Sequence, residues 1–423
     1  MIKRLFAIGF IFICTAVAWA ILAGVTTQRT RDADAGARGR VEKIWGSSQR
    51  QRPPQISLVR EENETVVMTD DKGVETRKTR RKRQLIPVAV AGSDLRAALS
   101  LAHRQKGLLW YATYGVRFEG SYRFGNPTAE RQIVEISLPF PAERAVFDDL
   151  QFAVDGLSWH SQPVAQSGRI SGSIALQPQQ SALLRVAYRS QGLSRWSYDF
   201  GDGVAEVRDF RLAVTTDFRD VDFPDDGVSP TARTATADGW QLVWTFRRLI
   251  SGVNVAVLMP EKLQPGPLAS QISAFAPVSL FFFIVVLLAV GVVRRIDIHP
   301  MHFFFLAAAF FSFHLLFAYL ADLVSIHVAF GTAAATSLFL TISYLRVAIG
   351  GRFAFLAAGT AQLLYLVLFS YAFFFKGLTG LAVTVGAILT LLVLMQLTAR
   401  VDWREVFTRP AGSVRHLPAS TDR

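Results

Sequence analysis

Ionisable side chains inside apolar stretches are the residues of this 423-residue chain best placed to do chemistry. His314 lies deep in an apolar run, Asp322 and His327 flank the short turn that follows, and Tyr319 precedes Asp322 by one helical turn. A charge at the centre of a bilayer costs roughly 2.5–3.5 kcal/mol or more, so such residues usually face a bundle interior. Because imidazole titrates near physiological pH, this candidate set could pass protons or hold a cation. The alternative is a neutral His314 bonded to a neighbouring helix, with Asp322 solvated at the interface.

Two other groups of polar residues have looser spacing. Asp297, His299 and His302 lack a tetrahedral metal spacing, which favours interfacial anchoring. An acidic stretch superficially resembles a calcium loop, but it lacks the alternate ligands and terminal Glu of an EF-hand, which favours a solvated loop. Its members are Asp217, Asp220, Asp222, Asp225 and Asp226. Gln362, in a later apolar run, could join two helices by a hydrogen bond.

No catalytic signature is present in the sequence. There is no G-x-S-x-G elbow, no H-E-x-x-H pair and no phosphate-binding glycine loop. The single cysteine, Cys14, excludes a disulfide framework and any Cys-ligated metal site, and we interpret it as a buried free thiol. We therefore predict that the chain is not an enzyme and needs neither a cofactor nor a metal.

Six apolar runs must position the polar residues. The first, residues 5–25, contains no charge and is long enough to cross a hydrocarbon core of about 30 Å. Its basic start and the Ala18-Trp19-Ala20 sequence also fit a secretory signal, but the run continues past that point, which favours an uncleaved anchor. The later runs cover about 275–293, 301–321, 323–345, 353–375 and 378–398.

The basic residues predict how six spans are oriented, because Lys and Arg of short loops tend to stay in the cytoplasm. One side of a six-span topology carries Lys3, Arg4, Arg294, Arg295, Arg346, Arg352, Arg400 and Arg404. The opposite connections carry only Asp322 and Lys376. Both termini are therefore predicted to lie inside the cell, and the long segment between the first two spans outside the membrane. In a Gram-negative bacterium that outer space is the periplasm.

The segment after the first span begins with polar, arginine-rich residues that favour a juxtamembrane helix, which Pro53-Pro54 would stop. Residues 60–83 have many charges and few large apolar side chains, so they predict a loop or a flexible hairpin. They end in a basic cluster of Arg77, Lys78, Arg80, Arg81, Lys82 and Arg83. Outside the membrane this cluster cannot meet cytoplasmic nucleic acid, but anionic lipid head groups or envelope polymers could bind it. A solvated charge run without a partner is the alternative.

From about residue 108 the apolar residues alternate, which predicts strands. The alternation covers residues near 116–124, 134–140, 184–188, 210–214, 240–246 and 253–259. Asp238-Gly239 has the composition of a hairpin turn. Many short strands at this spacing predict an antiparallel sandwich or two packed sheets. Residues 93–106 are instead predicted to form a helix with a Ser93-Asp94 cap. Pro265-Gly266-Pro267 is expected to be a stiff link into the second span.

The predicted fold is a multi-pass α-helical membrane protein with six transmembrane helices and a large β-rich, sandwich-like periplasmic domain. The divisions are an anchor (1–27), a juxtamembrane helix with charged loop and connecting segment (28–107), the β-rich domain (108–271), a five-helix bundle (272–399) and a cytoplasmic tail (400–423).

Several short motifs carry a family resemblance. They are Trp45-Gly46-Ser47-Ser48-Gln49, the segment from His103 to Tyr111, His299-Pro300-Met301, Tyr319-Leu320-Ala321-Asp322 and Arg400-Val401-Asp402-Trp403. In these the chain resembles the CreD family of inner-membrane proteins, over most of its length but least between 142 and 233. The external domain is shorter than that family's pattern. The resemblance implies a role in envelope integrity, with links in some bacteria to a two-component response and to tolerance of β-lactams, colicins or detergents. It implies no catalytic residues.

We therefore favour a non-enzymatic inner-membrane protein that supports envelope integrity or an envelope-stress response. Its β-rich domain would contact a periplasmic ligand, or a periplasmic or inner-membrane protein partner. The alternative is a small-molecule or lipid transporter or flippase that uses polar residues of the third and fourth spans, although repeated halves and broken spans are not evident. A membrane-embedded hydrolase ranks third, because the span interiors are nearly free of ionisable groups. The oligomeric state is open.

Overall fold

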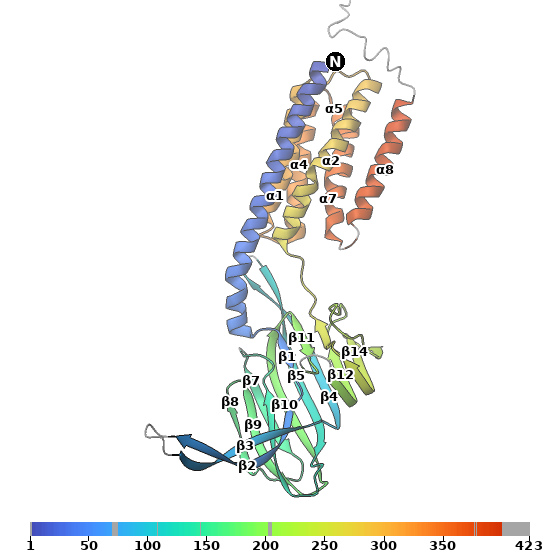
Figure 1. Ribbon diagram of the computed structural model, residues 1–423. Helices are drawn as coiled ribbons and strands as arrows, with labels where there is room; N and C mark the ends of the chain where they lie inside the picture. Colours follow the sequence, from blue (N-terminus) through green and yellow to red (C-terminus); the bar gives the residue numbers. More distant parts are fainter. Residues whose placement is uncertain are drawn as a thin grey trace, which may run out of the picture. The chain divides into compact units, whose positions relative to one another are not determined.

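The computed structural model describes residues 2–69, 75–107, 109–143, 145–201, 205–375, 377 and 379–399. The chain divides into two compact units. The first, here called the helical unit, comprises Met1–Ala35 and Leu263–Arg423, and the second, the β unit, comprises Gly36–Lys262. Figure 1 shows the strands in the β unit and the long helices in the helical unit, except that the first helix continues past residue 35 into the β unit.

Long apolar helices make up the helical unit. They are α1 (Ile2–Trp45), α2 (Pro265–Val293), α3 (Pro300–Leu320), α4 (Ile326–Ala348) and α8 (Thr379–Thr398). Between α4 and α8, a continuous helical stretch consists of α5 (Gly351–Phe353), the π-helix η1 (Ala354–Gly359), α6 (Thr360–Gln362), the π-helix η2 (Leu363–Leu368), α7 (Phe369–Tyr371) and the 3₁₀-helix η3 (Ala372–Phe374). Within the described residues, six helical stretches are long and apolar enough to cross a membrane. Each of the six apolar runs found in the sequence overlaps one of these stretches, although several boundaries differ by a few residues or more.

The ends of two helices differ from the prediction. α1 extends as one helix to Trp45 and stops there because Gly46 takes a left-handed φ of 88°, so Pro53-Pro54 plays no part in ending it. Pro265-Gly266-Pro267 is not a link but the first turn of α2, where a proline needs no amide hydrogen. A Cβ on Gly266 would clash with Oγ1 of Thr30, so glycine allows α1 and α2 to approach closely. Cys14 is exposed on α1, not buried as predicted.

Three sheets, mostly antiparallel, form the β unit. Its first strands are β1 (Gln49–Gln51), β2 (Gln55–Thr69), β3 (Glu75–Val88), β4 (Gly92–Lys106), β5 (Leu109–Gly125), β6 (Gln132–Pro139) and β7 (Phe147–Val154). The later ones are β8 (Ser161–Gln166), β9 (Arg169–Leu176), β10 (Ser181–Leu193), β11 (Arg195–Tyr198), β12 (Ala205–Thr216), β13 (Ala232–Ala235), β14 (Trp240–Ser251) and β15 (Val255–Leu258). The sheet orders are β13-β14-β12-β4-β5-β10-β7, β3-β2-β6-β9-β8 and β1-β11-β15. The two parallel pairs are β4 with β12 and β1 with β11.

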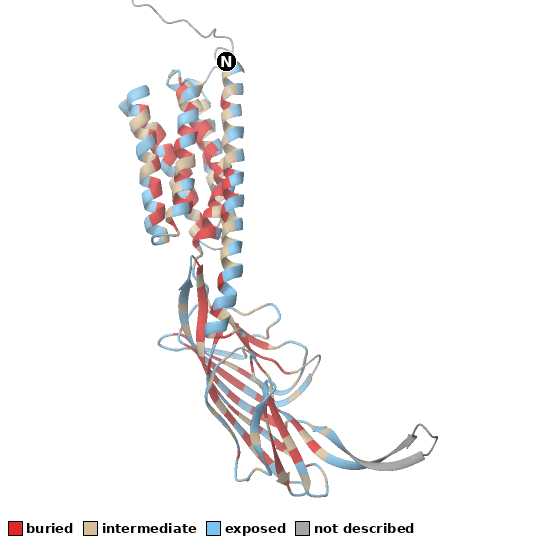
Figure 2. Cartoon of the chain, turned by 90° about the vertical axis from the view of Figure 1, so that its left-hand side faces the viewer, coloured by how far each residue is buried: buried red, intermediate tan, exposed pale blue. Residues whose placement is uncertain are grey.

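One hydrophobic core joins the inner faces of these sheets, and Figure 2 shows buried positions repeating along the strands. At its centre lie four buried phenols, here called the tyrosine core: Tyr114, Tyr122, Tyr188 and Tyr198. Burial raises the pKa of each phenol above its usual range. The hydroxyl of Tyr114 donates to Arg195 O at 2.8 Å, and that of Tyr188 donates to Gln51 Oε1 at 2.7 Å.

Residues 93–106 form strand β4, so the predicted helix is wrong. Leu95 and Leu99 fit a helical spacing of four, but Ala97 between them also faces the core, which gives the period of a strand. β4 pairs with β5 from Gly92↔Arg123 to Lys106↔Leu109. Those cross-strand hydrogen bonds pair the backbone N–H and C=O groups of β4. They cannot be predicted from the sequence of residues 93–106 alone.

The described parts of the charged segment, residues 60–69 and 75–83, lie in the antiparallel strands β2 and β3, which pair from Ile56↔Val88 to Thr69↔Glu75. Residues 70–74 lie outside the described part of the structure. A hairpin was one of the two predicted forms. Strand β2 also pairs with β6, which places the base of the hairpin in the five-stranded sheet. The side chains of residues 77–82, which make up most of the basic cluster, lie outside the described part of the structure. Arg83 is described and pairs with Glu135 at 2.8 Å.

Candidate functional site

The candidate polar set of the third and fourth helices does not form one site. His314 is buried, and its Nδ1 donates to Phe310 O at 2.9 Å, one turn back on the same helix. Its ring lies edge-on to Trp19 of α1, with the ring centroids 5.2 Å apart. Among the described residues, neither Nε2 of His314 nor Nε1 of Trp19 has a hydrogen-bond partner. His314 therefore packs between α1 and α3 rather than in a chain of polar groups.

Asp322 pairs with Arg29 of α1, a residue that the sequence analysis did not single out. The same guanidinium lies 5.3 Å from the ring centroid of Tyr319 and donates to Ala318 O at 3.3 Å. Burial raises the pKa of Asp322, and the nearby Arg29 opposes that shift. His327 stacks on Phe374 at a centroid distance of 5.3 Å. Asp322 and Tyr319 thus share Arg29, whereas both histidines have other neighbours.

Gln362 bonds between helices, as the sequence suggested. Its Nε2 donates to Oγ of Ser337 at 2.8 Å, and Oγ of Ser337 donates to Ala309 O at 2.6 Å. Gln362 and Ser337 are fully buried. Oε1 of Gln362 has no hydrogen-bond partner among the described residues, and Gln362 ends the short α-helical turn between two π-helical segments. Segments of π-helix are frequent at functional sites, so this buried chain of three hydrogen-bonded groups is a candidate functional feature of the helical unit.

The described residues of the loop between α2 and α3 form no cluster of side chains that could hold a metal ion. Asp297 pairs with Arg4, which also donates to Ile298 O. His299 caps α3 by accepting from the Met301 amide at 3.2 Å, and His302 bonds the Tyr344 hydroxyl at 2.7 Å. These contacts tie helix ends together, which suits an anchoring role.

The acidic stretch of the β unit is solvent-exposed at all five Asp positions. Asp217 accepts from the Leu101 amide at 2.8 Å, and Asp226 pairs with Arg195 at 2.9 Å. The Arg195 guanidinium lowers the pKa of Asp226 below its usual range. These carboxylates therefore have partners of different kinds and do not converge.

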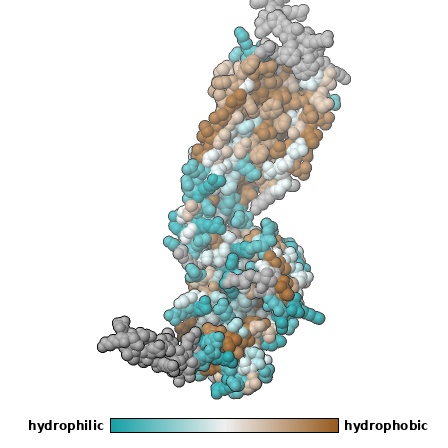
Figure 3. All heavy atoms as spheres, in the orientation of Figure 1, coloured by the Kyte–Doolittle hydropathy of each residue, from teal (hydrophilic) through white to brown (hydrophobic). Residues whose placement is uncertain are grey.

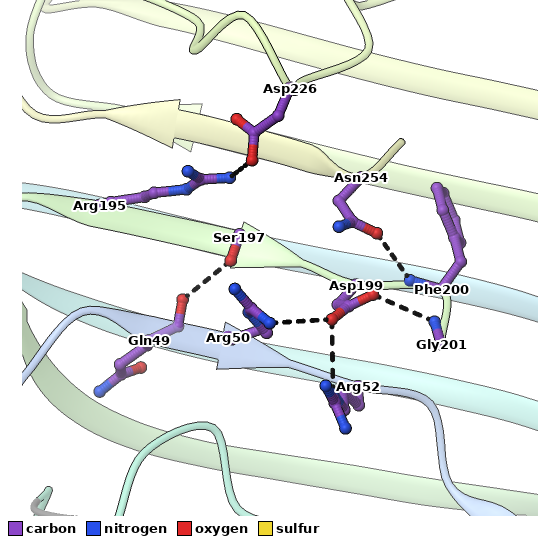
Figure 4. Close-up of polar contacts among 10 residues, drawn as sticks. All are labelled: Gln49, Arg50, Arg52, Arg195, Ser197, Asp199, Phe200, Gly201, Asp226 and Asn254. Atoms are coloured by element: carbon purple, nitrogen blue, oxygen red, sulfur yellow. Dashed lines mark hydrogen bonds and ion pairs between the residues drawn. The ribbon is translucent and has the colours of Figure 1, made fainter. Parts of the chain in front are cut away.

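A buried polar layer lies around β1, where the motif Trp45-Gly46-Ser47-Ser48-Gln49 ends. Figure 4 shows Asp199 between Arg50 and Arg52, whose nitrogens lie 3.6 and 3.4 Å from its Oδ2. Asp199 Oδ1 also accepts from the Gly201 amide at 3.1 Å. Gln49 donates to Ser190 Oγ at 2.7 Å and Gln191 O at 2.8 Å. These contacts join β1 to its neighbours, so the motif residues described here are structural.

The exposed face of the seven-stranded sheet carries a polar groove with a volume of about 830 Å³. Its floor is formed by alternate residues of three central strands: Ala98 and Ser100 of β4, Gly115 and Arg117 of β5, and Arg189 and Gln191 of β10. Asp148, Asp217 and Asp238 also line it. The volume lies within the roughly 300–1,000 Å³ typical of small-molecule sites. The groove is therefore the best candidate for a binding site in the described part of the β unit.

Strand register places two arginines side by side in this groove. Arg117 of β5 is directly opposite Arg189 of β10, and Ala98 of β4 is on the other side of Arg117. Arg189 pairs with Asp149, and with Asp148 at 3.7 Å. Arg117 is exposed and has no acidic partner among the described residues. Like charges directly opposite each other on a sheet are unfavourable, and the two carboxylates beside Arg189 offset that repulsion, which leaves Arg117 as the arginine without an acidic partner among the described residues.

Neither Arg117 nor Arg189 was among the candidate residues predicted from the sequence. Both are outward positions of strands that were predicted, but which outward residues become neighbours depends on the pairing of β5 with β10. The sequence shows that both residues are arginines, but it does not show that they are neighbours.

Comparisons with known proteins give no family. No family model matches the sequence, and no curated protein matches it. A crystal structure of a putative nutrient binding protein from Legionella pneumophila is 10% identical, with a TM-score of 0.29, over 48% of this chain and 77% of that one. A two-domain M1 zinc metallopeptidase mutant bound to L-tryptophan is 14% identical, with a TM-score of 0.21, over 40% of this chain and 44% of that one. The M1 zinc metallopeptidase from Deinococcus radiodurans is 12% identical, with a TM-score of 0.22, over 74% of this chain and 93% of that one. Likeness at these scores carries no argument about function.

Proposed function

We propose that the chain is a multi-pass inner-membrane protein of the CreD type that supports envelope integrity and is not an enzyme. In this proposal the helical unit crosses the bilayer six times, and the β unit lies in the periplasm and binds a ligand in the groove of its seven-stranded sheet. The membrane part rests on the charges that bound the uncharged stretch of α1. The integrity part rests on the family resemblance.

Two ion pairs bracket the uncharged part of α1. Near its start Arg4 pairs with Asp297 of the α2–α3 loop, and further along Arg29 pairs with Asp322 of the α3–α4 turn. Arg29 follows Arg4 by 25 residues, which corresponds to about 37 Å at 1.5 Å per residue. A bilayer has a hydrocarbon core of about 30 Å and a total thickness of about 40–45 Å. This match between the spacing of the charge pairs and the thickness of a bilayer is the observation that carries the proposal.

Surface composition supports the same proposal. On the face shown in Figure 3 the helical unit is mostly hydrophobic, whereas the β unit is mostly hydrophilic. Arg4 and Asp297 also tie the first helix to the loop after α2, which carries Arg294 and Arg295. A cytoplasmic location of that basic end agrees with the positive-inside tendency.

Transport is not proposed here, because the residues invoked for a polar pathway have separate partners. His314 packs against Trp19, while Asp322 pairs with Arg29.

Cysteine labelling tests the topology. Cys14 is the only cysteine, so Cys14→Ser gives a clean background for single cysteines at Ser158 in the β unit and at Arg295 in the α2–α3 loop, both exposed. We expect a membrane-impermeant maleimide, applied after outer-membrane permeabilisation, to label the Ser158→Cys variant. The Arg295→Cys variant should react only after the inner membrane is also opened. The reverse labelling pattern would contradict the proposed orientation.

Survival of a deletion strain tests the role in the envelope. Loss of the protein should increase sensitivity to detergent or a β-lactam, and the wild-type chain should restore survival. A deletion strain that matches its parent under both challenges would refute the integrity role.

A further inference from the structure

We infer that the groove of the seven-stranded sheet binds a short peptide with a free carboxylate and a free ammonium group. This inference rests on the proposed function of the β unit as a ligand-binding domain, and it specifies the class of ligand. It follows from the position of Arg117, which has no acidic partner among the described residues, and from the two carboxylates of Asp217 and Asp238 on the opposite side of the groove.

The carboxylate would bind at Arg117. The guanidinium carries five N–H donors in a planar fork that matches a carboxylate, and Arg117 has no acidic partner among the described residues. Its neighbours in the groove are small: Ala98 lies across from it on β4, and Gly115 lies two residues before it on β5. Nothing larger than a methyl group therefore projects from these two positions beside the fork.

Arg189 would support that site without being its main donor. It is held by Asp149, which has a left-handed φ of 51° and lies where the pairing of β7 with β10 shifts register. The bulge brings an extra carboxylate to this edge of the sheet. Arg189 is thus largely neutralised, whereas Arg117, one strand further in, keeps its charge for a ligand.

The ammonium group would bind at the opposite side of the groove. Asp217 follows the end of β12, and Asp238 lies in the turn between β13 and β14. Asp217 uses one oxygen to accept from the Leu101 amide, and Asp238 has no partner within the described ranges. The groove is lined by three carboxylates and two arginines, so its net charge would repel a simple dianion. The same lining suits a ligand that carries one positive and one negative charge.

The width of the groove suggests the length of the ligand. Thr215 of β12 pairs with Ala98 of β4, which pairs with Arg117 of β5, so two strand spacings separate the two sides. At about 4.8 Å per strand this is about 10 Å. An extended peptide of about three residues covers the same distance.

Calorimetric titration of the full-length protein in detergent tests the inference, with trialanine as the probe. We expect trialanine to bind with a stoichiometry of one. Capping its amino end with acetyl, or its carboxyl end as an amide, should each weaken binding at least tenfold. Inorganic phosphate should bind no better than the capped peptides. Equal binding of free and capped trialanine, or stronger binding of phosphate, would overturn the inference.

Three variants assign the two ends of the peptide. Arg117→Gln should weaken trialanine binding at least tenfold. Asp238→Asn should abolish the preference for the free amino end while keeping the hairpin turn, because Asn-Gly and Asp-Gly favour the same turn. Arg211→Gln is the matched control, since Arg211 pairs with Asp94 at 3.3 Å on β4, away from Arg117. Unchanged binding by Arg117→Gln, or an equal loss in Arg211→Gln, would contradict the site.

Binding to the purified protein does not depend on its orientation in a membrane. If trialanine fails to bind while labelling and survival agree with the proposed function, only the ligand class is wrong. If the peptide binds while the labelling pattern is reversed, the proposed function fails and the site remains.

Discussion

Removing either end of the hydrogen bond between Gln362 and Ser337 should have unequal effects. Ser337→Ala deletes the acceptor of the Gln362 amide, which lies in a fully buried position. Gln362→Met keeps a side chain of similar length and removes an oxygen that already lacks a partner among the described residues. We therefore expect Ser337→Ala to destabilise the helical unit and Gln362→Met to change its stability little.

The magnitudes follow from the number of unpaired polar atoms that each variant leaves. Leaving a buried amide without a partner costs roughly 1–3 kcal/mol. A hydrogen bond between membrane helices contributes about 0.6 kcal/mol on average. Ala309 O retains a bond from Ser312 Oγ at 2.7 Å when Ser337 is lost, so it adds little to the cost. We expect Ser337→Ala to cost about 1–3 kcal/mol, and Gln362→Met to stay within about 1 kcal/mol of wild type. The double variant should recover at least half of the loss.

Unfolding of the full chain in mixed detergent micelles, followed by tryptophan fluorescence, measures these differences. Thr336→Ala is the matched control, because Thr336 is half-buried on the same helix and its hydroxyl bonds the Thr332 O of its own helix at 2.9 Å, with no other partner among the described residues. A cost for Gln362→Met as large as that for Ser337→Ala, without recovery in the double variant, would refute the reasoning. Oε1 of Gln362 would then have a partner such as a bound water or cation, and the transporter hypothesis would regain support.

Three further predictions concern other parts of the chain. His314→Phe should keep or slightly raise the free energy of unfolding in the same assay, because it removes a buried nitrogen that lacks a partner among the described residues. A loss above about 2 kcal/mol would argue for a functional His314. Arg29→Gln should reduce the free energy of unfolding by about 1–2 kcal/mol, because it leaves the carboxylate of Asp322, whose side chain is only 9% exposed, without its partner. Asp322→Asn should cost less, because the Arg29 side chain that remains is 36% exposed and can reach water. Equal costs for the two variants would contradict this reasoning. The stability of the β unit should fall as pH rises above about 10, because the phenols of the tyrosine core stay neutral in the folded state but ionise in the unfolded chain. Below that pH the phenols are neutral in both states, and the tyrosine core does not make stability depend on pH. Absorbance at 295 nm should then show four of the nine tyrosines ionising only on unfolding, and full titration of the folded protein would contradict the burial.

The sequence alone determined the two classes of structure in this chain. An uncharged run of about 20 residues is long enough to cross a bilayer, and in an apolar medium its backbone polar groups must bond within the run itself, which a helix achieves. The long helices were therefore predictable. Strict alternation of apolar residues predicted β5, β6, β10, β12 and β14 for the same reason, since one face of each strand must be buried. The hydrogen bond of Gln362 was also predictable, because a polar amide inside a helix bundle needs a partner.

Only the tertiary structure decided which of these residues are neighbours. The helix predicted at 93–106 became β4 because pairing with β5 and β12 outweighed an ambiguous local pattern. Arg29 meets Asp322 across 293 residues of sequence. Arg117 meets Arg189 through a register that nothing local specifies. Composition and periodicity describe what each residue type favours in its own element, whereas charge pairs and grooves depend on distances between elements, which are fixed only when the chain packs.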